Sequence, residues 1–400
     1  MQPANDFSFA RIVAEADAEL GTLPSGDAPL IQATPFQWRD EAAIPPRRWL
    51  YGKHYLRRFL SLDIAAGGIG KSSLKIGEAL SMTTGRDLYG KGLPEGALRV
   101  WLYNLEDPAE ETERRIVAAA KRFSIAPEDV GDRLFSDSGR ERPVVIAEEL
   151  DGRARIMAPV VDAIIAEITD RRIDVMIVDP FVSSHSVSEN DNRAIDMVAK
   201  LWALIADRCD CSINLVHHVR KGNGAEASAD SARGAKSLTD AARSVMVYNR
   251  MTKDEGEAAG IAPEQIGFYF RVQNDKANLA PPEAADWYRM NNVDLANGDQ
   301  VGVACAWQWP DTFQGVSPDH LRQVQQAIAE GEWMLDPRAE HKWAGVAVAR
   351  VLGLSPEGDR RRIGGIIKKW IENGALAIDE RKNEARKIKK YVEVGDWVTE

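Results

Sequence analysis

The feature that most constrains this chain is a glycine-rich stretch, Ala65-Ala66-Gly67-Gly68-Ile69-Gly70-Lys71-Ser72, between an apolar run and a helical one. Glycines allow consecutive backbone N–H groups to turn inward around a polyphosphate, and the following helix N-terminus adds positive potential. The lysine of such a loop reaches the β- and γ-phosphates, and the next hydroxyl binds Mg²⁺. The pattern therefore predicts a phosphate-binding loop made of Ala66, Gly67, Gly68, Ile69, Gly70, Lys71, Ser72 and Ser73. Ala65 replaces the first glycine of the usual pattern, and the alternative is a turn that binds nothing.

Length and composition set the class of protein. A chain of 400 residues, 44% apolar and 28% charged, has room for two or three soluble domains. Its net charge of -10 excludes a wholly basic nucleic-acid coat, although a local basic patch remains open. No apolar run approaches a membrane span, Met1–Leu20 carries acids, and three cysteines cannot build a disulfide framework. We therefore expect a cytoplasmic protein without a membrane segment.

Short β-rich runs alternate with helical segments after the phosphate-loop strand. The runs are Phe59–Ala65, Leu98–Leu105, Val175–Asp179, Cys211–Val216, Ser244–Tyr248 and Phe268–Gln273. The helical segments are Lys71–Met82, Glu110–Phe123, Met157–Arg171 and Arg193–Arg208. This alternation predicts an α/β fold with a mostly parallel sheet. We expect a lead-in at residues 1–44, an ATPase-like core at 45–312 and a smaller domain at 318–400.

Two acids end strands of the predicted sheet. Asp179 closes an apolar strand and is placed to hold the magnesium water shell, unless it only caps the turn before Pro180. Because Pro180 is not a second acid, a hydrolase needs another carboxylate to activate water. Glu106 directly follows the predicted strand Leu98–Leu105 and could orient that water. The alternative is that Asp107 caps the following helix and Glu106 has no catalytic role.

His217 and His218 end the next strand. A zinc site with Cys209 or Cys211 fails, because a rise of about 3.3 Å per residue puts Cys211 and His217 roughly 20 Å apart. His218 is instead a candidate sensor of phosphate or of the attacking water, and a plain strand-end histidine is the alternative.

These stretches together carry a family resemblance. AAGGIGKSS, NLEDP, VMIVDP, LVHH and ARGAKSLTDAARS resemble the RepA-like hexameric helicase group of RecA-type ATPases, from about Trp49 to Trp309. The resemblance implies a RecA-like P-loop core, ATP with Mg²⁺ at subunit interfaces of a six-membered ring, and single-stranded DNA in its channel. It implies that Lys71, Glu106, Asp179 and His218 are catalytic and that Ser72 and Asp179 hold the metal.

The same resemblance suggests an arginine supplied to a neighbouring subunit. Arg233 is the first candidate, Arg243 the second and Lys276 the third, and each could be an ordinary surface cation. An arginine across an interface stabilises charge on the transferred phosphoryl group. DNA would meet the loops Phe181–Asn192 and Val219–Ala232, of which the second offers Arg220 and Lys221.

The C-terminal part is predicted to be a small winged helix-turn-helix domain. Its elements are the helices His341–Leu354 and Asp359–Asn373 and a hairpin at Ala375–Val394. Residues 358–392 hold eleven Lys/Arg against five Asp/Glu in an otherwise acidic protein. The candidate DNA-binding residues there are Arg360, Arg361, Arg362, Lys368, Lys369, Lys382 and Arg386. A domain that mediates protein contacts is the alternative.

Three functions fit these patterns. The first is an ATP-driven DNA motor or helicase for replication or recombination, such as that of a mobile element. The second is an ATP-dependent regulator or loader that binds DNA without unwinding it. The third, a small-molecule phosphotransferase, is disfavoured by the basic C-terminal region and by the lack of an evident lid.

Overall fold

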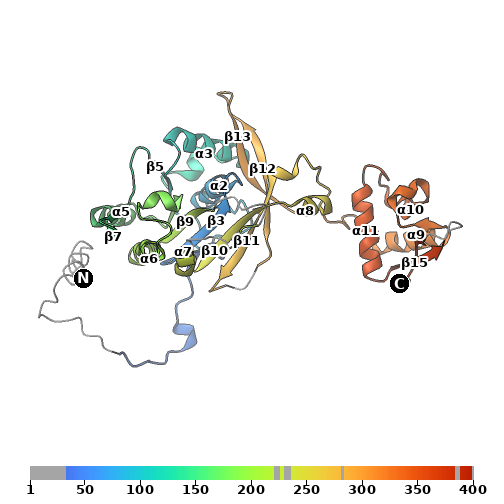
Figure 1. Ribbon diagram of the computed structural model, residues 1–400, viewed down its shortest axis with the longest axis horizontal. Helices are drawn as coiled ribbons and strands as arrows, with labels where there is room; N and C mark the ends of the chain where they lie inside the picture. Colours follow the sequence, from blue (N-terminus) through green and yellow to red (C-terminus); the bar gives the residue numbers. More distant parts are fainter. Residues whose placement is uncertain (1–32, 220–225, 229–235, 281–282, 383–387, 399–400) are drawn as a thin grey trace, which may run out of the picture. The chain divides into compact units, whose positions relative to one another are not determined.

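The structure is a computed structural model that describes residues 33–219, 226–228, 236–280, 283–382 and 388–398. The chain divides into two compact units (Figure 1). The first comprises Met1–Arg250 and Phe268–Trp307, and the second comprises Met251–Gly267 and Gln308–Glu400. The second unit thus includes a short internal segment that the sequence analysis placed within the core.

The first unit is organised around a nine-stranded sheet in the order β13-β12-β11-β10-β3-β9-β8-β4-β5. The strands are β3 Leu60–Ala66, β4 Val100–Asn104, β5 Leu134–Ser138, β8 Val175–Asp179, β9 Ser212–Val219, β10 Ser244–Arg250, β11 Tyr269–Ala277, β12 Asp286–Asp294 and β13 Gln300–Trp307. From β10 through β3 to β5 neighbouring strands are parallel, whereas β10 to β13 pair antiparallel. The predicted α/β fold with a mostly parallel sheet is confirmed.

Helices cover both faces of this sheet, as Figure 1 shows. Val175 and Ile177 belong to a core that includes α2 (Lys71–Thr84) and α3 (Ala109–Phe123). Met176 and Val178 belong to the opposite core, which includes residues of α5 (Ala158–Arg171) and α6 (Asn192–Arg208). Alternate residues of one strand therefore serve two cores, which explains why the strand is apolar throughout.

Smaller elements complete the first unit. They are η1 Glu41–Ala43, β1 Trp49–Tyr51, β2 Tyr55–Leu56, α4 Pro127–Val130, β6 Ala147–Leu150, β7 Arg153–Ile156, η2 Phe181–Ser184, α7 Lys236–Ala241 and η3 Ile266–Phe268, the last crossing into the internal segment. β1 pairs with β2, and β6 pairs with β7. None of the described helices has the continuous apolar length that a bilayer crossing requires.

The second unit contains three longer helices and a three-stranded sheet. Its elements are α8 Lys253–Ala258, α9 Pro318–Ala329, β14 Trp333–Met334, η4 Pro337–Lys342, α10 Ala344–Leu352, α11 Arg360–Glu372, β15 Leu376–Lys382 and β16 Ile388–Val394. The strands follow the order β14-β16-β15 around a core that includes Trp343 and Trp370. The helix expected from His341 begins only at Ala344, because η4 ends at Lys342 just before it.

Candidate functional site

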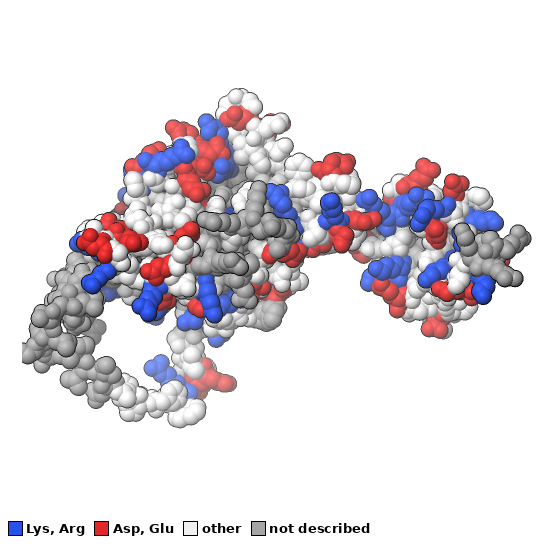
Figure 2. Space-filling model, viewed as in Figure 1, with Lys and Arg blue, Asp and Glu red and all other residues white. Residues whose placement is uncertain are grey.

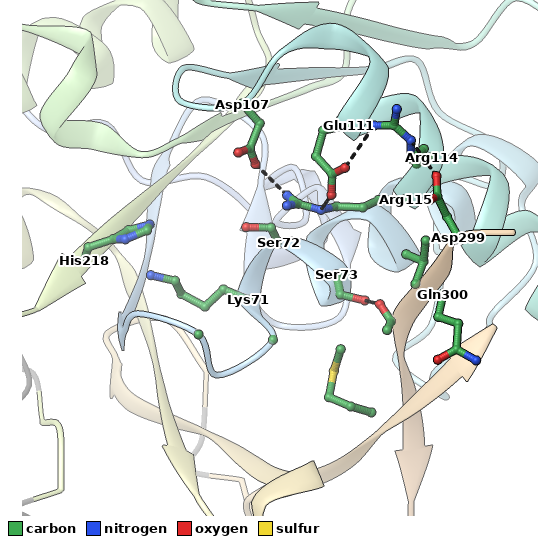
Figure 3. A pocket seen from close by; sticks show the side chains of 15 residues that line it. Lys71, Ser72, Ser73, Asp107, Glu111, Arg114, Arg115, His218, Asp299 and Gln300 are labelled. Atoms are coloured by element: carbon green, nitrogen blue, oxygen red, sulfur yellow. Dashed lines mark hydrogen bonds and ion pairs between the residues drawn. The ribbon is translucent and has the colours of Figure 1, made fainter. Parts of the chain in front are cut away.

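A cavity of about 620 Å³ opens beside the phosphate loop (Figure 3). Its lining comes from three places: the start of α2, the start of α3, and the β12–β13 hairpin. The lining residues are Gly68, Gly70, Lys71, Ser72, Ser73, Asp107, Glu111, Arg114, Arg115, His218, Met290, Asp299, Gln300, Val301 and Gly302. The carboxyl ends of parallel strands meet at one edge of a sheet, so the loop after β3, Asp107 after β4 and His218 of β9 line the cavity together.

The main chain of the loop requires glycine at two positions. Gly68 and Gly70 have φ angles of 75° and 113°, in the region that side chains rarely adopt. A Cβ atom on Gly70 would lie 2.8 Å from Met290 Sδ and 3.1 Å from Phe270 Cε1. The loop is therefore seated closely on the antiparallel strands, while Lys71 begins α2 directly after it.

Lys71 is the buried cation of the site. Its side chain is only 4% exposed, and Nζ donates to the Ala65 carbonyl at 3.4 Å. Burial lowers the pKa of Lys71 to about 8, although the carboxylates of Asp179, Asp63 and Glu106 partly oppose that effect. Figure 3 shows its ammonium group extending toward His218. A desolvated ammonium held by one long hydrogen bond is suited to an anionic ligand.

Ser72, Asp179 and His218 come together from three elements. Ser72 Oγ donates to Asp179 Oδ2 at 2.7 Å, and His218 Nε2 lies 3.3 Å from Asp179 Oδ1. A hydroxyl beside a carboxylate is a hard-oxygen pair that suits Mg²⁺, which takes few protein ligands and completes its shell with phosphates and water. In the part of the chain that the structure describes, no three His, Cys, Asp or Glu side chains form a metal cage. The two predicted metal ligands thus fit the ion.

Glu106 is exposed at the end of β4, with its backbone N–H donating to Asn104 Oδ1 at 2.9 Å. Its negative charge acts on Lys71, so the carboxylate lies on the same side of the sheet as the loop. Asp107, which the sequence analysis treated as a possible helix cap, instead binds Arg115 Nη1 at 2.7 Å and lines the cavity. The helix α3 is preceded by Pro108 without a side-chain cap.

Sequence reasoning missed a chain of ion pairs across the cavity. Arg115 bridges Asp107 and Glu111, at 2.7 and 2.9 Å. Arg114 bridges Glu111 and Asp299, at 3.2 and 3.0 Å, and so connects α3 to the β12–β13 hairpin (Figure 3). The helical spacing of Glu111 and Arg115 was a local signal for one pair. No local signal marked Asp299, which lies far along the chain.

Two further histidines lie buried behind the phosphate loop. Burial lowers the pKa values of His185 and His217 to about 4, so both rings are neutral at neutral pH. Phe181 packs against them, with ring centroids 4.7 Å from His185 and 6.3 Å from His217. His218 rather than His217 contacts Asp179, and its role as a sensor of phosphate or of the attacking water stays a prediction.

A buried polar cluster supports the strand before the loop. Asp63 of β3 is fully buried and lies 2.9 Å from Lys75 Nζ and 3.1 Å from His54 Nε2. Burial alone would raise the pKa of Asp63, but Lys75 and His54 hold it well below its usual range. Lys75 also binds Glu78 of the same helix at 2.7 Å. Because Asp63 lies on β3 and Lys75 on α2, their ion pair links this strand to this helix. Sequence reasoning did not identify it.

The candidate trans-acting cations fall in different places. Arg233 lies outside the described residues. Lys276 donates to the carbonyls of Thr239 and Asp240 at 2.6 and 3.3 Å, and the backbone N–H of Arg243 donates to Leu60 O. Lys276 is thus engaged within its own chain.

The candidate DNA-binding residues also divide. Arg220, Lys221 and Arg386 lie outside the described residues. Arg360, Arg361 and Arg362 donate to main-chain carbonyls of Pro337, Ile261 and Thr312, respectively. Lys368 and Lys369 both lie near Glu372, and Lys382 is exposed. Figure 2 shows basic and acidic side chains interspersed over this unit rather than a field of one sign. DNA binding stays a prediction.

The loop, the strand-end acid and the mostly parallel sheet define a P-loop ATPase domain. Residues 27–224 match a family model described as an AAA domain. This part of the chain, which holds Lys71, Glu106, Asp179 and His218, is therefore similar to an AAA domain, and the match supports an ATPase of the P-loop type. The matched range ends before β10–β13 and before all of the second unit.

Proposed function

We propose that this protein hydrolyses ATP with Mg²⁺ and uses the energy as a DNA motor, a helicase acting in replication or recombination, such as that of a mobile element. The observation that carries the ATPase part is the convergence of Lys71, Ser72 and His218 on one cavity. Asp179 lies directly beside this lining, because it accepts from Ser72 Oγ and contacts His218 Nε2. The motor part rests on the resemblance to RepA-like helicases and on the excess of basic residues at 358–392.

Each residue has a role that its position suits. Lys71 and the glycine main chain bind the β- and γ-phosphates, and Ser72 and Asp179 hold Mg²⁺, which neutralises phosphate charge. Glu106 orients water and accepts its proton, and its exposure leaves room for that water. His218 reports on the γ-phosphate through its contact with Asp179.

The nucleoside half of ATP would lie toward the β12–β13 hairpin. Ser73 Oγ is already bonded to Gly302 O and Ala304 N, at 3.0 and 2.9 Å, so β13 adjoins the start of α2. The cavity continues between Arg114 of α3 and Met290 of β12. This end combines an apolar surface with charged groups, as nucleoside sites do.

For the motor we propose a homo-oligomer, a hexameric ring with single-stranded DNA in its channel and duplex DNA near the second unit. Arg233 is the proposed arginine supplied to a neighbouring site. The alternative is an ATP-dependent DNA-binding regulator or loader without unwinding activity. The alternative shares every ATP-site residue, and the carbonyl contacts of Arg360–Arg362 leave fewer free cations for DNA than the sequence suggests.

The test compares ATP hydrolysis with and without a single-stranded oligonucleotide, together with unwinding of a tailed duplex. For the motor we expect DNA to accelerate hydrolysis and the duplex to separate, with six chains per assembly by mass when an ATP analogue and DNA are present. Hydrolysis without unwinding by a monomer or dimer would support the regulator. A rate of ATP hydrolysis that is the same with and without DNA would contradict both the motor and the regulator.

Variants connect the activity to the site. Glu106→Gln should lower turnover about a hundredfold or more, because the water loses its base. Glu113→Gln is the matched control, since Glu113 is an exposed carboxylate on α3 that, unlike Glu106, is not among the charges acting on Lys71. Full turnover in Glu106→Gln would remove Glu106 from the mechanism.

A further inference from the structure

The phosphate loop is held by a pair of residues from β10 and β11. Arg250 Nη2 donates to the Gly68 carbonyl, and Phe270 lies against Gly70. Arg250 and Phe270 are cross-strand partners in the antiparallel register. One residue pair therefore touches both glycines whose positive φ angles shape the loop.

The same pair flanks the point where the chain leaves the first unit. β10 ends at Arg250, β11 begins at Tyr269, and the segment Met251–Gly267 between them belongs to the second unit. This segment carries α8, whose first turn is closed by reciprocal bonds between Thr252 and Glu255. The segment is therefore covalently continuous with Arg250 at its first residue, Met251.

Within the second unit, α11 holds this segment and the chain that follows β13. Arg361 Nη1 donates to Ile261 O at 3.1 Å. Arg362 donates to Thr312 O at 3.3 Å and also to Gln314 O, in the stretch that follows β13. Two neighbouring arginines thus each fasten one covalent connection between the units.

We infer that Arg250 is a positioning residue of the nucleotide site and that Arg361, by holding Met251–Gly267, sets how firmly Arg250 holds the phosphate loop. The C-terminal unit thereby regulates nucleotide affinity. A ligand or partner that draws Arg361 away from Ile261 loosens the segment and weakens nucleotide binding. The inference rests on the proposed nucleotide binding and deepens it.

The physical basis is preorganisation. A loop already held in its binding conformation loses less freedom when the ligand arrives, so releasing it weakens affinity. A hydrogen bond from a charged donor is strong enough to change an equilibrium by about tenfold. Coupling is also reciprocal, so a bound nucleotide must stabilise the segment as much as the segment stabilises the nucleotide.

The test measures nucleotide affinity in the full chain, by titration with a fluorescent ATP analogue and Mg²⁺. We expect Arg361→Ala to weaken binding by about threefold to tenfold. Arg360→Ala is the matched control, because Arg360 is the adjacent arginine of α11 but donates to Pro337 O, outside both connections. Arg250→Ala should weaken nucleotide binding at least as much as Arg361→Ala, and Arg250→Lys should recover part of the lost affinity. Adding Arg361→Ala to Arg250→Ala should weaken binding little further.

The outcomes separate this inference from the proposed function. If the wild-type chain binds no nucleotide, the proposed function fails. If it binds and Arg361→Ala has the same nucleotide affinity as both wild type and Arg360→Ala, only the coupling is overturned.

Hydrogen exchange gives a readout that does not depend on folding of the Arg250 variants. Nucleotide should slow amide exchange in Met251–Gly267 of the wild-type chain, and unchanged exchange there contradicts the coupling.

Discussion

Lys71 shows how one residue combines a local motif with a distant environment. The motif places its ammonium at the start of α2, but the surroundings that desolvate it come from strands far apart in the chain. The free site therefore holds a lysine that is partly neutral at mildly alkaline pH. A bound polyphosphate favours the charged form and raises that pKa again.

This coupling predicts a pH dependence of nucleotide binding. Below the pKa of about 8, Lys71 is already charged and affinity is insensitive to its titration. Above it, binding must take up a proton, so affinity should fall by about tenfold per pH unit until the pKa of the bound state is reached. Isothermal titration from pH 7 to 9.5 in two buffers of different ionisation enthalpy measures both affinity and proton uptake. A flat affinity without proton uptake above pH 8 would contradict this account of Lys71.

Among the elements, those with a strong local pattern were predicted closely. The helix predicted at Lys71–Met82 is α2, and the strand predicted at Val175–Asp179 is β8 with the same bounds. The apolar side chains of β8 are buried in two cores, and those of α2 are buried in one of them. Both patterns of apolar residues are visible in the sequence.

The β12–β13 hairpin was not predicted, for a physical reason. β12 contains the partly buried Asn291 and the exposed Asn292 among other polar side chains, so it lacks the apolar run of the parallel strands. Its role depends on contacts with α2 and α3, such as the bond between Ser73 and Gly302. Five of the fifteen residues that line the cavity come from this hairpin, Asp299 among them, and local patterns could not predict their place in the site.

The conformation of the phosphate loop predicts that alanine substitutions at two of its glycines change stability to different extents. Gly70→Ala places a Cβ 2.8 Å from Met290 Sδ at a φ of 113° and should destabilise the fold by about 1–3 kcal/mol. Gly67→Ala meets nothing within 4 Å and has no positive φ, so its unfolding free energy should match wild type. Urea denaturation of both variants measures the difference. Equal stability would show that the loop is not seated on β12 as described.

At the scale of the whole molecule, the chain crosses three times between an ATPase unit and a smaller helical and β-sheet unit, after Arg250, Gly267 and Trp307. The sequence resemblance covers mainly the first unit, and the AAA domain match covers residues 27–224. Function in the second unit therefore rests on charge pattern and element order, which are weaker evidence than a converged site. Arg361 and Arg362, two of the candidate DNA-binding residues, donate to main-chain carbonyls of stretches that join the units. The charge pattern gave no sign of these contacts, and DNA binding by the two arginines stays a prediction.

The central claim is that a nucleoside triphosphate with Mg²⁺ occupies the cavity between α2, α3 and β13. The most direct measurement is calorimetric titration of a non-hydrolysable ATP analogue into the wild-type chain and into Lys71→Ala at pH 7.5. The account predicts one site per chain in the wild type and at least a hundredfold weaker binding in the variant, because a charge-assisted bond to phosphate is lost. No binding heat in the wild type, or the same affinity in both proteins, would contradict it.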